Sequence, residues 1–224
     1  MSNLALIPAR GGSKRIPHKN IKDFLGKPII AYSIEAALKS GLFDEVMVST
    51  DDDEIVEIAR QYGAKVPFMR TKSTANDYAT LSDVIDEVIT TYKERGQEYD
   101  HFCCILATAP FVTSELLVKS FDFFVKRKFD SLRPITNYGY PIQRAFRMDE
   151  KGVVSFMHPE YASTRSQDLE PAYHDAGLFY WGKAATGLRG KVRGGYVISE
   201  DLCQDIDTED DWRIAEMKYK LLHK

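Results

Sequence analysis

Short apolar runs alternate with segments of helical periodicity along this 224-residue chain. The first run, residues 4–7, ends at a proline and leads through a glycine-containing loop into apolar residues at helical spacing over 28–41. Such an alternation favours a sheet of parallel strands joined by helices that cover both of its faces. The chain is therefore predicted to be an α/β protein with a doubly wound, mostly parallel, Rossmann-like sheet. The expected strands are residues 4–7, 46–48, 64–69, 101–106, 130–136, 179–181 and 197–198, and the expected helices are residues 28–41, 50–63 (capped by Thr50), 81–92, 114–125 and 212–222.

The pattern changes between residues 137 and 173, where Tyr, Pro, Arg and polar residues replace the apolar runs. A turn is expected at residues 149–152, Asp-Glu-Lys-Gly, so this stretch is predicted to leave the core as hairpins. The predicted organisation is an α/β core formed by residues 1–136 and 174–224, with residues 137–173 inserted into it.

The composition excludes several classes of protein. Apolar residues make up 44% and charged residues 28%, and the longest mostly apolar stretch, residues 102–112, is far shorter than the ~20 residues of a membrane-spanning helix. The 30 cations and 33 anions leave a net charge of −3, unlike the basic excess of nucleic-acid-binding proteins. Of the three cysteines, Cys103 and Cys104 lie in an apolar run, as expected of buried thiols in a reducing cytoplasm.

A basic loop follows the first predicted strand, with the sequence PARGGSKRIPHKN at residues 8–20. Ligands of open α/β sheets bind at the carboxyl ends of the strands, where this loop would lie. Glycines allow backbone amides to approach phosphate oxygens, and Arg10 and Lys19 bring charges that can follow a triphosphate. The loop is neither G-x-G-x-x-G nor a Walker P-loop, so a dinucleotide site is disfavoured. A phosphate site is predicted; the alternative is a solvated, flexible basic loop.

An acidic segment near the end of the chain, QDIDTEDDW at residues 204–212, has two parts. Thr208 and Asp211 are spaced as a helix-capping box, which accounts for the later acids. Asp205 and Asp207 precede the cap, and in an extended segment their side chains point to the same side. Two converging carboxylates need a cation between them, and Mg²⁺ combines a few carboxylates with substrate phosphates. The segment is predicted to bind Mg²⁺; the alternative is a pair of surface acids.

The residues quoted above, with VSTDDDEI at 48–55, resemble the acylneuraminate cytidylyltransferase (CMP-sialic acid synthetase) family essentially from end to end. The segments GGSKRIP, PIQRAFR (141–147) and RSQDLEPAYHDAG (165–177) resemble most the branch of the family that uses pseudaminic acid. The resemblance implies a Mg²⁺-dependent nucleotidyltransferase of this fold, in which CTP and a nonulosonic acid, pseudaminic acid in the first place, give the CMP-sugar and pyrophosphate.

The resemblance also implies roles for individual residues. The implied catalytic residues are Arg10, Lys19, Asp205 and Asp207, with the two aspartates as metal ligands. The implied nucleotide site comprises Arg10, Gly11, Gly12, Ser13, Lys14, Lys19, Asn20, Arg70 and Thr80. The implied sugar site comprises Gln143, Arg165 and Tyr180, to which we add His174. For His174 the alternative is a hydrogen-bonded structural role. Ala107 and Gln143 depart from the sialic acid members, which carry Gln and Lys there, so N-acetylneuraminate itself is less expected than another nonulosonic acid.

Further alternatives concern substrate and assembly. N-acetylneuraminate, legionaminate and 3-deoxy-manno-octulosonate are the other candidate sugars, and a catalytically silent nucleotide-binding regulator is the candidate from another class. The family resemblance implies a homodimer in which residues 137–172 form an arm that closes the neighbouring subunit's sugar pocket; a self-contained lid is the alternative. The expected protein is thus a cytoplasmic enzyme that binds neither nucleic acid nor membrane.

Overall fold

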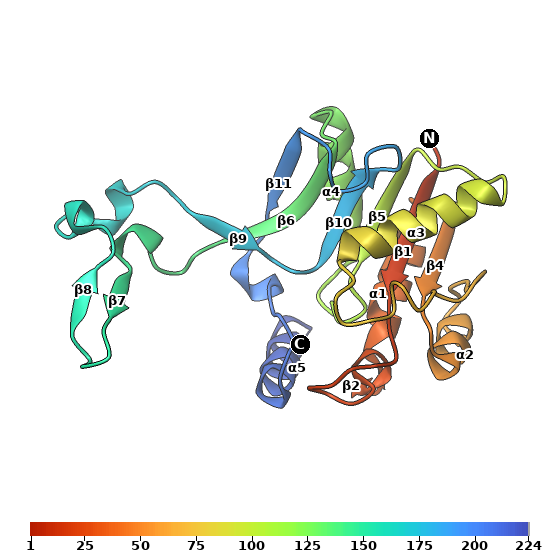
Figure 1. Cartoon of the computed structure of the whole chain (residues 1–224), viewed down its shortest axis with the longest axis horizontal. Helices are drawn as coiled ribbons and strands as arrows, with labels where there is room; N and C mark the ends of the chain where they lie inside the picture. The colour runs from red at the N-terminus through yellow and green to blue at the C-terminus, as the bar shows by residue number, and fades with distance from the viewer. Residues whose placement is uncertain (224) are drawn as a thin grey trace.

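The structure, a computed structural model, describes residues 1–223 and is built on a central sheet of seven strands (Figure 1). Six of them follow the order β11-β6-β10-β5-β1-β4, and β9 pairs with β6. The pairs β1–β4, β1–β5 and β6–β11 are parallel, whereas β10 and β9 run antiparallel to their neighbours. The predicted mostly parallel sheet is confirmed. The strands are β1 Asn3–Pro8, β4 Glu45–Ser49, β5 His101–Ile105, β6 Ser131–Asn137, β9 Tyr173–Asp175, β10 Phe179–Lys183 and β11 Arg193–Val197.

Five α-helices and two small hairpins complete the fold. The helices are α1 Ile29–Ser40, α2 Asp53–Gln61, α3 Leu81–Glu94, α4 Ser114–Lys126 and α5 Glu209–Leu222; the hairpins are β2 Asp23–Phe24 with β3 Lys27–Pro28, and β7 Phe146–Met148 with β8 Val154–Phe156; single 3₁₀ turns are η1 Lys19–Ile21, η2 Ile142–Arg144, η3 Pro159–Tyr161, η4 Ser166–Asp168 and η5 Glu200–Leu202. No helix within residues 1–223 is long and apolar enough to cross a bilayer.

Both faces of the sheet are covered because the side chains of its strands alternate. Ala5 and Ile7 belong to one buried cluster, which includes residues of α1, α2 and α4, whereas Leu4 and Leu6 belong to another, which includes residues of α3. The neighbouring cysteines Cys103 and Cys104 divide in the same way, and both are buried free thiols, as predicted. A third cluster, described below, joins the two ends of the chain.

Two local predictions are wrong. Residues 64–69 form no strand, and only Lys65 makes a bridge, to Met47, because Pro67 has no amide hydrogen for a ladder. Thr50 does not cap α2; the cap is Asp52, whose carboxylate accepts hydrogen bonds from the amides of Glu54 and Ile55. The capping box of α5, between Thr208 and Asp211, is confirmed.

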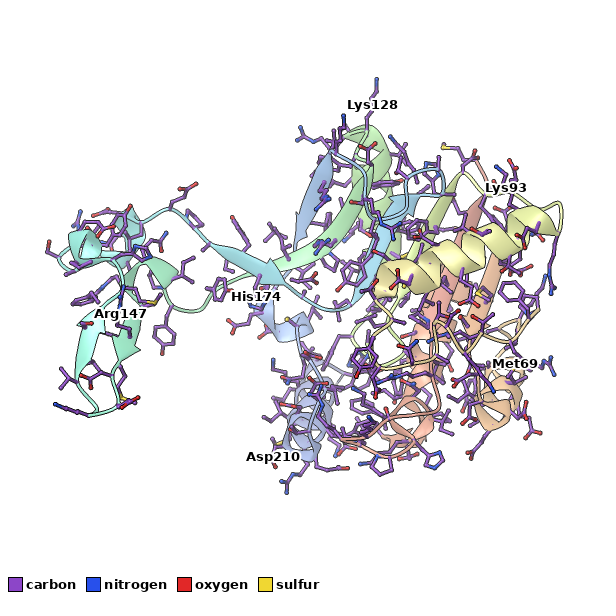
Figure 2. All side chains as sticks on the ribbon, in the orientation of Figure 1. Met69, Lys93, Lys128, Arg147, His174 and Asp210 are labelled. Carbon is purple, nitrogen blue, oxygen red and sulfur yellow. The ribbon has the colours of Figure 1, made fainter. Side chains whose placement is uncertain are left out.

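Residues 138–172 lie beyond the point where β6 and β9 pair, and they extend away from the body of the molecule (Figure 1). Arg147 lies on this extension and His174 at its base (Figure 2). The extension carries the β7–β8 hairpin, in which Phe146, Met148 and Val154 are exposed. It therefore presents apolar side chains to solvent in the isolated chain.

Candidate active site

A cavity of about 560 Å³ lies at the carboxyl ends of β1 and β5. The basic loop after β1 supplies most of its charged lining, and Leu106, Ala107 and Thr108 after β5 form another part. This is the edge at which open α/β sheets bind ligands. The remaining lining includes residues of the 70–84 segment and Asp207.

The two ends of the chain meet beside this cavity because of a hydrophobic cluster. Ile16 from the basic loop, Ile206 from the acidic segment and Trp212 from α5 are all buried in it. The Lys22 ammonium lies over the Trp212 ring, 4.7 Å from its centre, and pairs with Glu209. The acidic segment is thereby held against the basic loop.

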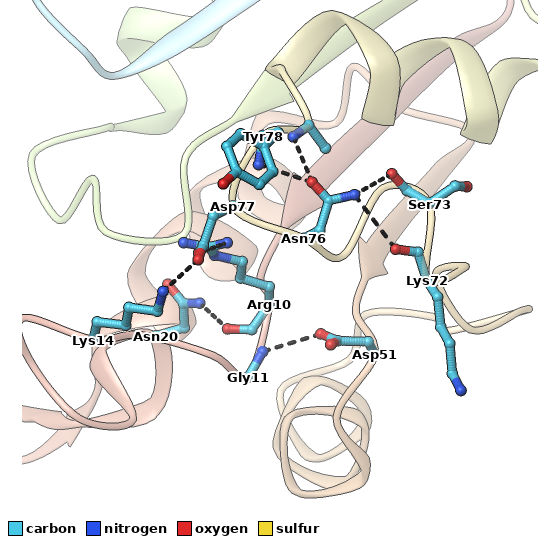
Figure 3. A network of polar contacts seen from close by, with 11 residues as sticks. Arg10, Gly11, Lys14, Asn20, Asp51, Lys72, Ser73, Asn76, Asp77 and Tyr78 are labelled. Atoms are coloured by element: carbon cyan, nitrogen blue, oxygen red, sulfur yellow. Dashed lines mark hydrogen bonds and ion pairs between the residues drawn. The ribbon is translucent and has the colours of Figure 1, made fainter.

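Two cations of the loop converge on one carboxylate. Arg10 Nη1 lies 2.8 Å from Asp77 Oδ1, and Lys14 Nζ pairs with the other oxygen of the same side chain (Figure 3). The Lys14 and Arg10 hydrogen bonds lower the pKa of Asp77. Asn20 Nδ2 donates to the Arg10 carbonyl at 2.9 Å and so holds the backbone beneath this cluster. Sequence reasoning did not single out Asp77, because nothing local in residues 71–80 marks it.

Two further cations converge on Asp207. Arg15 Nη1 lies 2.6 Å from Asp207 Oδ2, and Lys19 Nζ lies 3.5 Å from Oδ1 and 2.7 Å from the Ile206 carbonyl oxygen. The structure therefore brings Lys19 and Asp207 together, as expected. Arg15 was not predicted as a site residue, although it lies in the basic loop for which a phosphate site was predicted.

The two glycines of the loop differ. The Gly11 amide donates to Asp51 Oδ1 at 3.0 Å, and a Cβ at Gly11 would lie only 2.4 Å from Asp52 Oδ2. Gly11 thus allows the loop to approach the start of α2, and its amide is engaged there. Nothing lies within 4 Å of a Cβ placed on Gly12. Ser13 lines the cavity, whereas neither glycine does.

Arg70 and Thr80 form part of the wall. The Arg70 guanidinium is buried, donates to the Ser49 hydroxyl and carbonyl at 3.1 and 2.6 Å, and has its pKa lowered by that burial. The Thr80 hydroxyl caps α3 in a box with Asp83. Hydrogen bonds from the amide and hydroxyl of Thr80 lower the pKa of Asp83.

A second cavity, of about 600 Å³, adjoins the first, because Leu106 lines both. Its polar lining comprises His174, Asp175, Tyr180, Glu200, Cys203, Gln204, Asp205 and Lys218. Asp205 and Asp207 flank the buried Ile206 but line different cavities, so the acidic segment marks the border between the two.

Tyr180 is fixed inside the second cavity. Its hydroxyl donates to Asp175 Oδ1 at 3.2 Å, and the other oxygen of Asp175 accepts from Arg133 Nη1 at 3.0 Å. Burial, followed by the negative charge of Asp175, raises the pKa of the Tyr180 phenol. His174 donates from Nδ1 to the Asp175 carbonyl at 3.0 Å and packs against Tyr138.

Gln143 and Arg165 line neither cavity and lie on the 138–172 extension. Gln143 Nε2 donates to the Glu170 carbonyl at 2.8 Å, while its buried Oε1 has no hydrogen-bond partner within residues 1–223. Arg165 Nε pairs with Asp168 at 2.8 Å. Within one chain the structure does not bring these two residues to His174 and Tyr180.

The donor set at the border can be compared with what a metal requires. Within the described chain, no three His, Cys, Asp or Glu side chains are grouped to hold a metal ion by themselves. Mg²⁺ is commonly held by one or two carboxylates plus substrate phosphates and water. Asp205 and Asp207 supply carboxylates of that kind, but they line different cavities, so the structure does not show the predicted convergence of the two side chains. Asp207 already balances positive charge from Arg15 and Lys19.

A Rossmann-like sheet with a cationic loop and an acidic segment at one edge defines an α/β protein built to bind a polyanion. The chain belongs to the cytidylyltransferase family, whose model matches residues 4–184, and it is a nucleotidyltransferase. It is 46% identical to a pseudaminic acid cytidylyltransferase of Campylobacter jejuni, with 100% of this chain and 99% of the relative covered. It is 31% identical to a CMP-N,N'-diacetyllegionaminic acid synthase of Legionella pneumophila (99% and 97% covered). The resemblance to the family is confirmed.

The fold is also that of solved cytidylyltransferases. A CMP:2-keto-3-deoxy-manno-octonic acid synthetase complexed with CTP superimposes with a TM-score of 0.69 at 17% identity, with 100% and 99% of the two chains covered. A 4-diphosphocytidyl-2C-methyl-D-erythritol synthase from Anaerococcus prevotii gives 0.66 at 14% identity, with 98% of each chain covered.

Proposed function

We propose that the protein transfers CMP from CTP to a nonulosonic acid, pseudaminic acid in the first place, and releases pyrophosphate. One observation carries the proposal: Asp205 and Asp207 lie at the border of two adjoining cavities, of which the first is lined by the cations of the basic loop. A nucleotide in the first cavity and a sugar in the second would meet at these carboxylates. The name of the relative that is 46% identical supports the choice of sugar.

The nucleotide side depends on four cations. Arg10 and Lys14 bind the carboxylate of Asp77, and Arg15 and Lys19 bind that of Asp207. These four cations already bind carboxylate oxygens in the cavity, and they could bind the phosphate oxygens of a triphosphate in the same way. Arg10 and Lys19 would stabilise the pyrophosphate as it leaves. The remainder of the pocket is lined by Ser13, Asn20, Arg70 and Thr80. Gly11 allows the loop to approach the start of α2, whereas nothing in the structure requires a glycine at Gly12.

The chemistry is attack of the sugar's anomeric hydroxyl on the α-phosphorus of CTP. The P–O bond to pyrophosphate breaks as the new P–O bond forms, and the proton of the hydroxyl is released to solvent water. Asp205 and Asp207 would hold Mg²⁺, which when bound neutralises phosphate charge and lowers the pKa of a nearby hydroxyl. His174 and Tyr180 would position the sugar in the second cavity.

The sugar site requires a second copy of the chain in this proposal. Gln143 and Arg165 lie on the 138–172 extension and line neither of the two cavities of their own subunit, so we propose that they enter the partner's sugar cavity in a homodimer. The exposed side chains of Phe146 and Met148 would be covered there. Light scattering after size exclusion tests this: a fully active monomer would disprove it. We place the reaction in the cytoplasm, where Cys103 and Cys104 stay reduced.

The decisive experiment measures pyrophosphate release with each nucleoside triphosphate and with pseudaminic, legionaminic, N-acetylneuraminic and 3-deoxy-manno-octulosonic acids. We expect turnover with CTP and pseudaminic acid, and loss of turnover when Mg²⁺ is chelated. A protein that binds CTP but activates none of these sugars would be the silent regulator instead.

Asp207→Asn provides the matched test of the acidic segment. We expect turnover to be abolished while CTP binding weakens only moderately, because the loss of the proposed metal ligand is partly offset by the release of Arg15 and Lys19 from the Asp207 carboxylate. Asp210→Asn is the control, since Asp210 lies two residues beyond Thr208, outside both cavities, and pairs only with Arg213 among residues 1–223. Normal turnover of Asp207→Asn would remove the proposed metal role.

A further inference from the structure

Lys218 of α5 reaches the second cavity. It is the sole lysine or arginine, in the part of the chain that the structure describes, that lines this cavity. Its Nζ donates to the Cys203 carbonyl oxygen at 2.9 Å, and the side chain is half-buried. An ammonium group has three donors, so one backbone hydrogen bond leaves two of them available.

Lys218 differs from the cations of the first cavity in its partners. Arg10 and Lys14 share the carboxylate of Asp77, and Arg15 and Lys19 share that of Asp207. Lys218, by contrast, makes no ion pair with a carboxylate of residues 1–223; the hydrogen bond to Cys203 is its polar contact there. Lys218 is thus a cation at the wall of the cavity that is not engaged in an ion pair within residues 1–223.

The helix fixes this position. Trp212 and Ala215 are buried in the cluster that joins the two ends of the chain, and the capping box of Thr208 and Asp211 sets where α5 begins. Lys218 follows Ala215 by three residues, which places both on neighbouring turns of the same side of the helix. The ammonium is therefore presented from a rigid element rather than from a loop.

Acidic side chains line the cavity together with Lys218, so the positive charge of this lysine matters for the binding of an anionic ligand. Asp175, Glu200 and Asp205 line the same space, and an acidic ligand would be repelled by them. Arg133 neutralises Asp175 through a 3.0 Å contact. Asp205 belongs to the proposed metal pair. Among the groups that one subunit supplies to this cavity, Lys218 is therefore the direct counter-ion for a negatively charged ligand, beside the Arg165 that the proposed dimer would bring from the partner.

We propose that Lys218 binds the carboxylate of the acceptor sugar and thereby selects acidic sugars. This inference rests on the proposed function and names the group that recognises its substrate class. In a nonulosonic acid the carboxylate is attached to the anomeric carbon, so a group that holds it also fixes the direction of the reacting hydroxyl.

The test compares Lys218→Gln, which removes the charge at similar length, with Lys218→Arg, which keeps it, and with Lys220→Gln as a matched control. Lys220 lies two residues further along α5, is exposed and lines neither cavity. Each protein is titrated by calorimetry with pseudaminic acid and with its neutral C1 carboxamide, and KM is measured separately for sugar and CTP.

For Lys218→Gln we expect binding of the acid to weaken by roughly 10- to 100-fold, as for a lost hydrogen bond to a charged group, while binding of the carboxamide and KM for CTP hardly change. Lys218→Arg should retain most of the affinity. An equal loss for acid and carboxamide would mean that Lys218 only supports the Cys203 segment, and would overturn the inference, as would behaviour identical to Lys220→Gln.

Failure of the proposed function would look different. A wild-type protein that transfers CMP to no nonulosonic acid would refute the reaction, whereas the calorimetric comparison of acid with carboxamide is independent of turnover. A wild-type protein that binds both forms equally would refute the role of Lys218 even if the reaction proceeds.

Discussion

Substitution of the two adjacent glycines of the basic loop should affect stability differently. A Cβ at Gly11 would lie 2.4 Å from Asp52 Oδ2 and 3.0 Å from Asp52 Cβ, so Gly11→Ala must displace the Asp52 side chain. That side chain is the N-cap of α2, accepting hydrogen bonds from the amides of Glu54 and Ile55 at 2.9 and 3.1 Å. Gly12→Ala meets nothing within 4 Å and is the matched control.

The expected size follows from the cap. Loss of an aspartate N-cap costs about 1 kcal/mol of the free energy of unfolding. Both variants gain the same reduction in unfolded-state entropy, so the difference between them isolates the displacement of Asp52. For a chain of this length, about 1 kcal/mol corresponds to a melting temperature about 2–4 °C lower for Gly11→Ala than for Gly12→Ala.

Thermal unfolding followed by circular dichroism measures this difference, and KM for CTP reports whether the loop has moved. In an Asp52→Ala background the cap is already absent, so the gap between the two glycine variants should shrink. Equal melting temperatures for Gly11→Ala and Gly12→Ala would refute the reasoning that Gly11 is required by close packing against α2.

Two further outcomes follow from contacts at the site. Asp77→Asn should tighten CTP binding, measured by calorimetry, because the Asp77 carboxylate competes with phosphate for Arg10 and Lys14. Since those cations lower the pKa of Asp77, the competition is present at neutral pH and is lost as pH falls through that lowered pKa; weaker binding by the variant would contradict it. Thr208→Ala removes the capping box of α5 and should lower the free energy of unfolding by about 1 kcal/mol in chemical denaturation, with an unchanged midpoint as the contrary result.

The fold could be predicted because its determinants are local. Apolar runs such as residues 4–7 and the capping box at Thr208 carry their signal within a few residues, and each lies where it was expected. The strand predicted over 64–69 failed where a single residue, Pro67, opposed the apolar pattern. The antiparallel direction of β10 could not be read from its composition, since it depends on the path of the preceding extension.

The candidate site was only partly predictable, for a related reason. Lys19 and Asp207 were singled out by charge pattern, and the structure brings them together across 188 residues of sequence. Asp77 and Lys218 were not, because an acid in a polar loop and a lysine on an amphipathic helix are ordinary in sequence. Asp77 becomes a candidate site residue only through the cations with which it pairs, and Lys218 only through the cavity that it lines.

The division of the site at Leu106 and the acidic segment has a consequence for how such a protein can diversify. The cavity proposed for CTP is lined by residues of the amino-terminal half together with Asp207, whereas the cavity proposed for the sugar is lined mainly by residues after 173. Substitutions on one side of this partition need not disturb the other. With the proposed assignment of the two cavities, a lineage can exchange one acidic sugar for another while its binding of CTP stays intact.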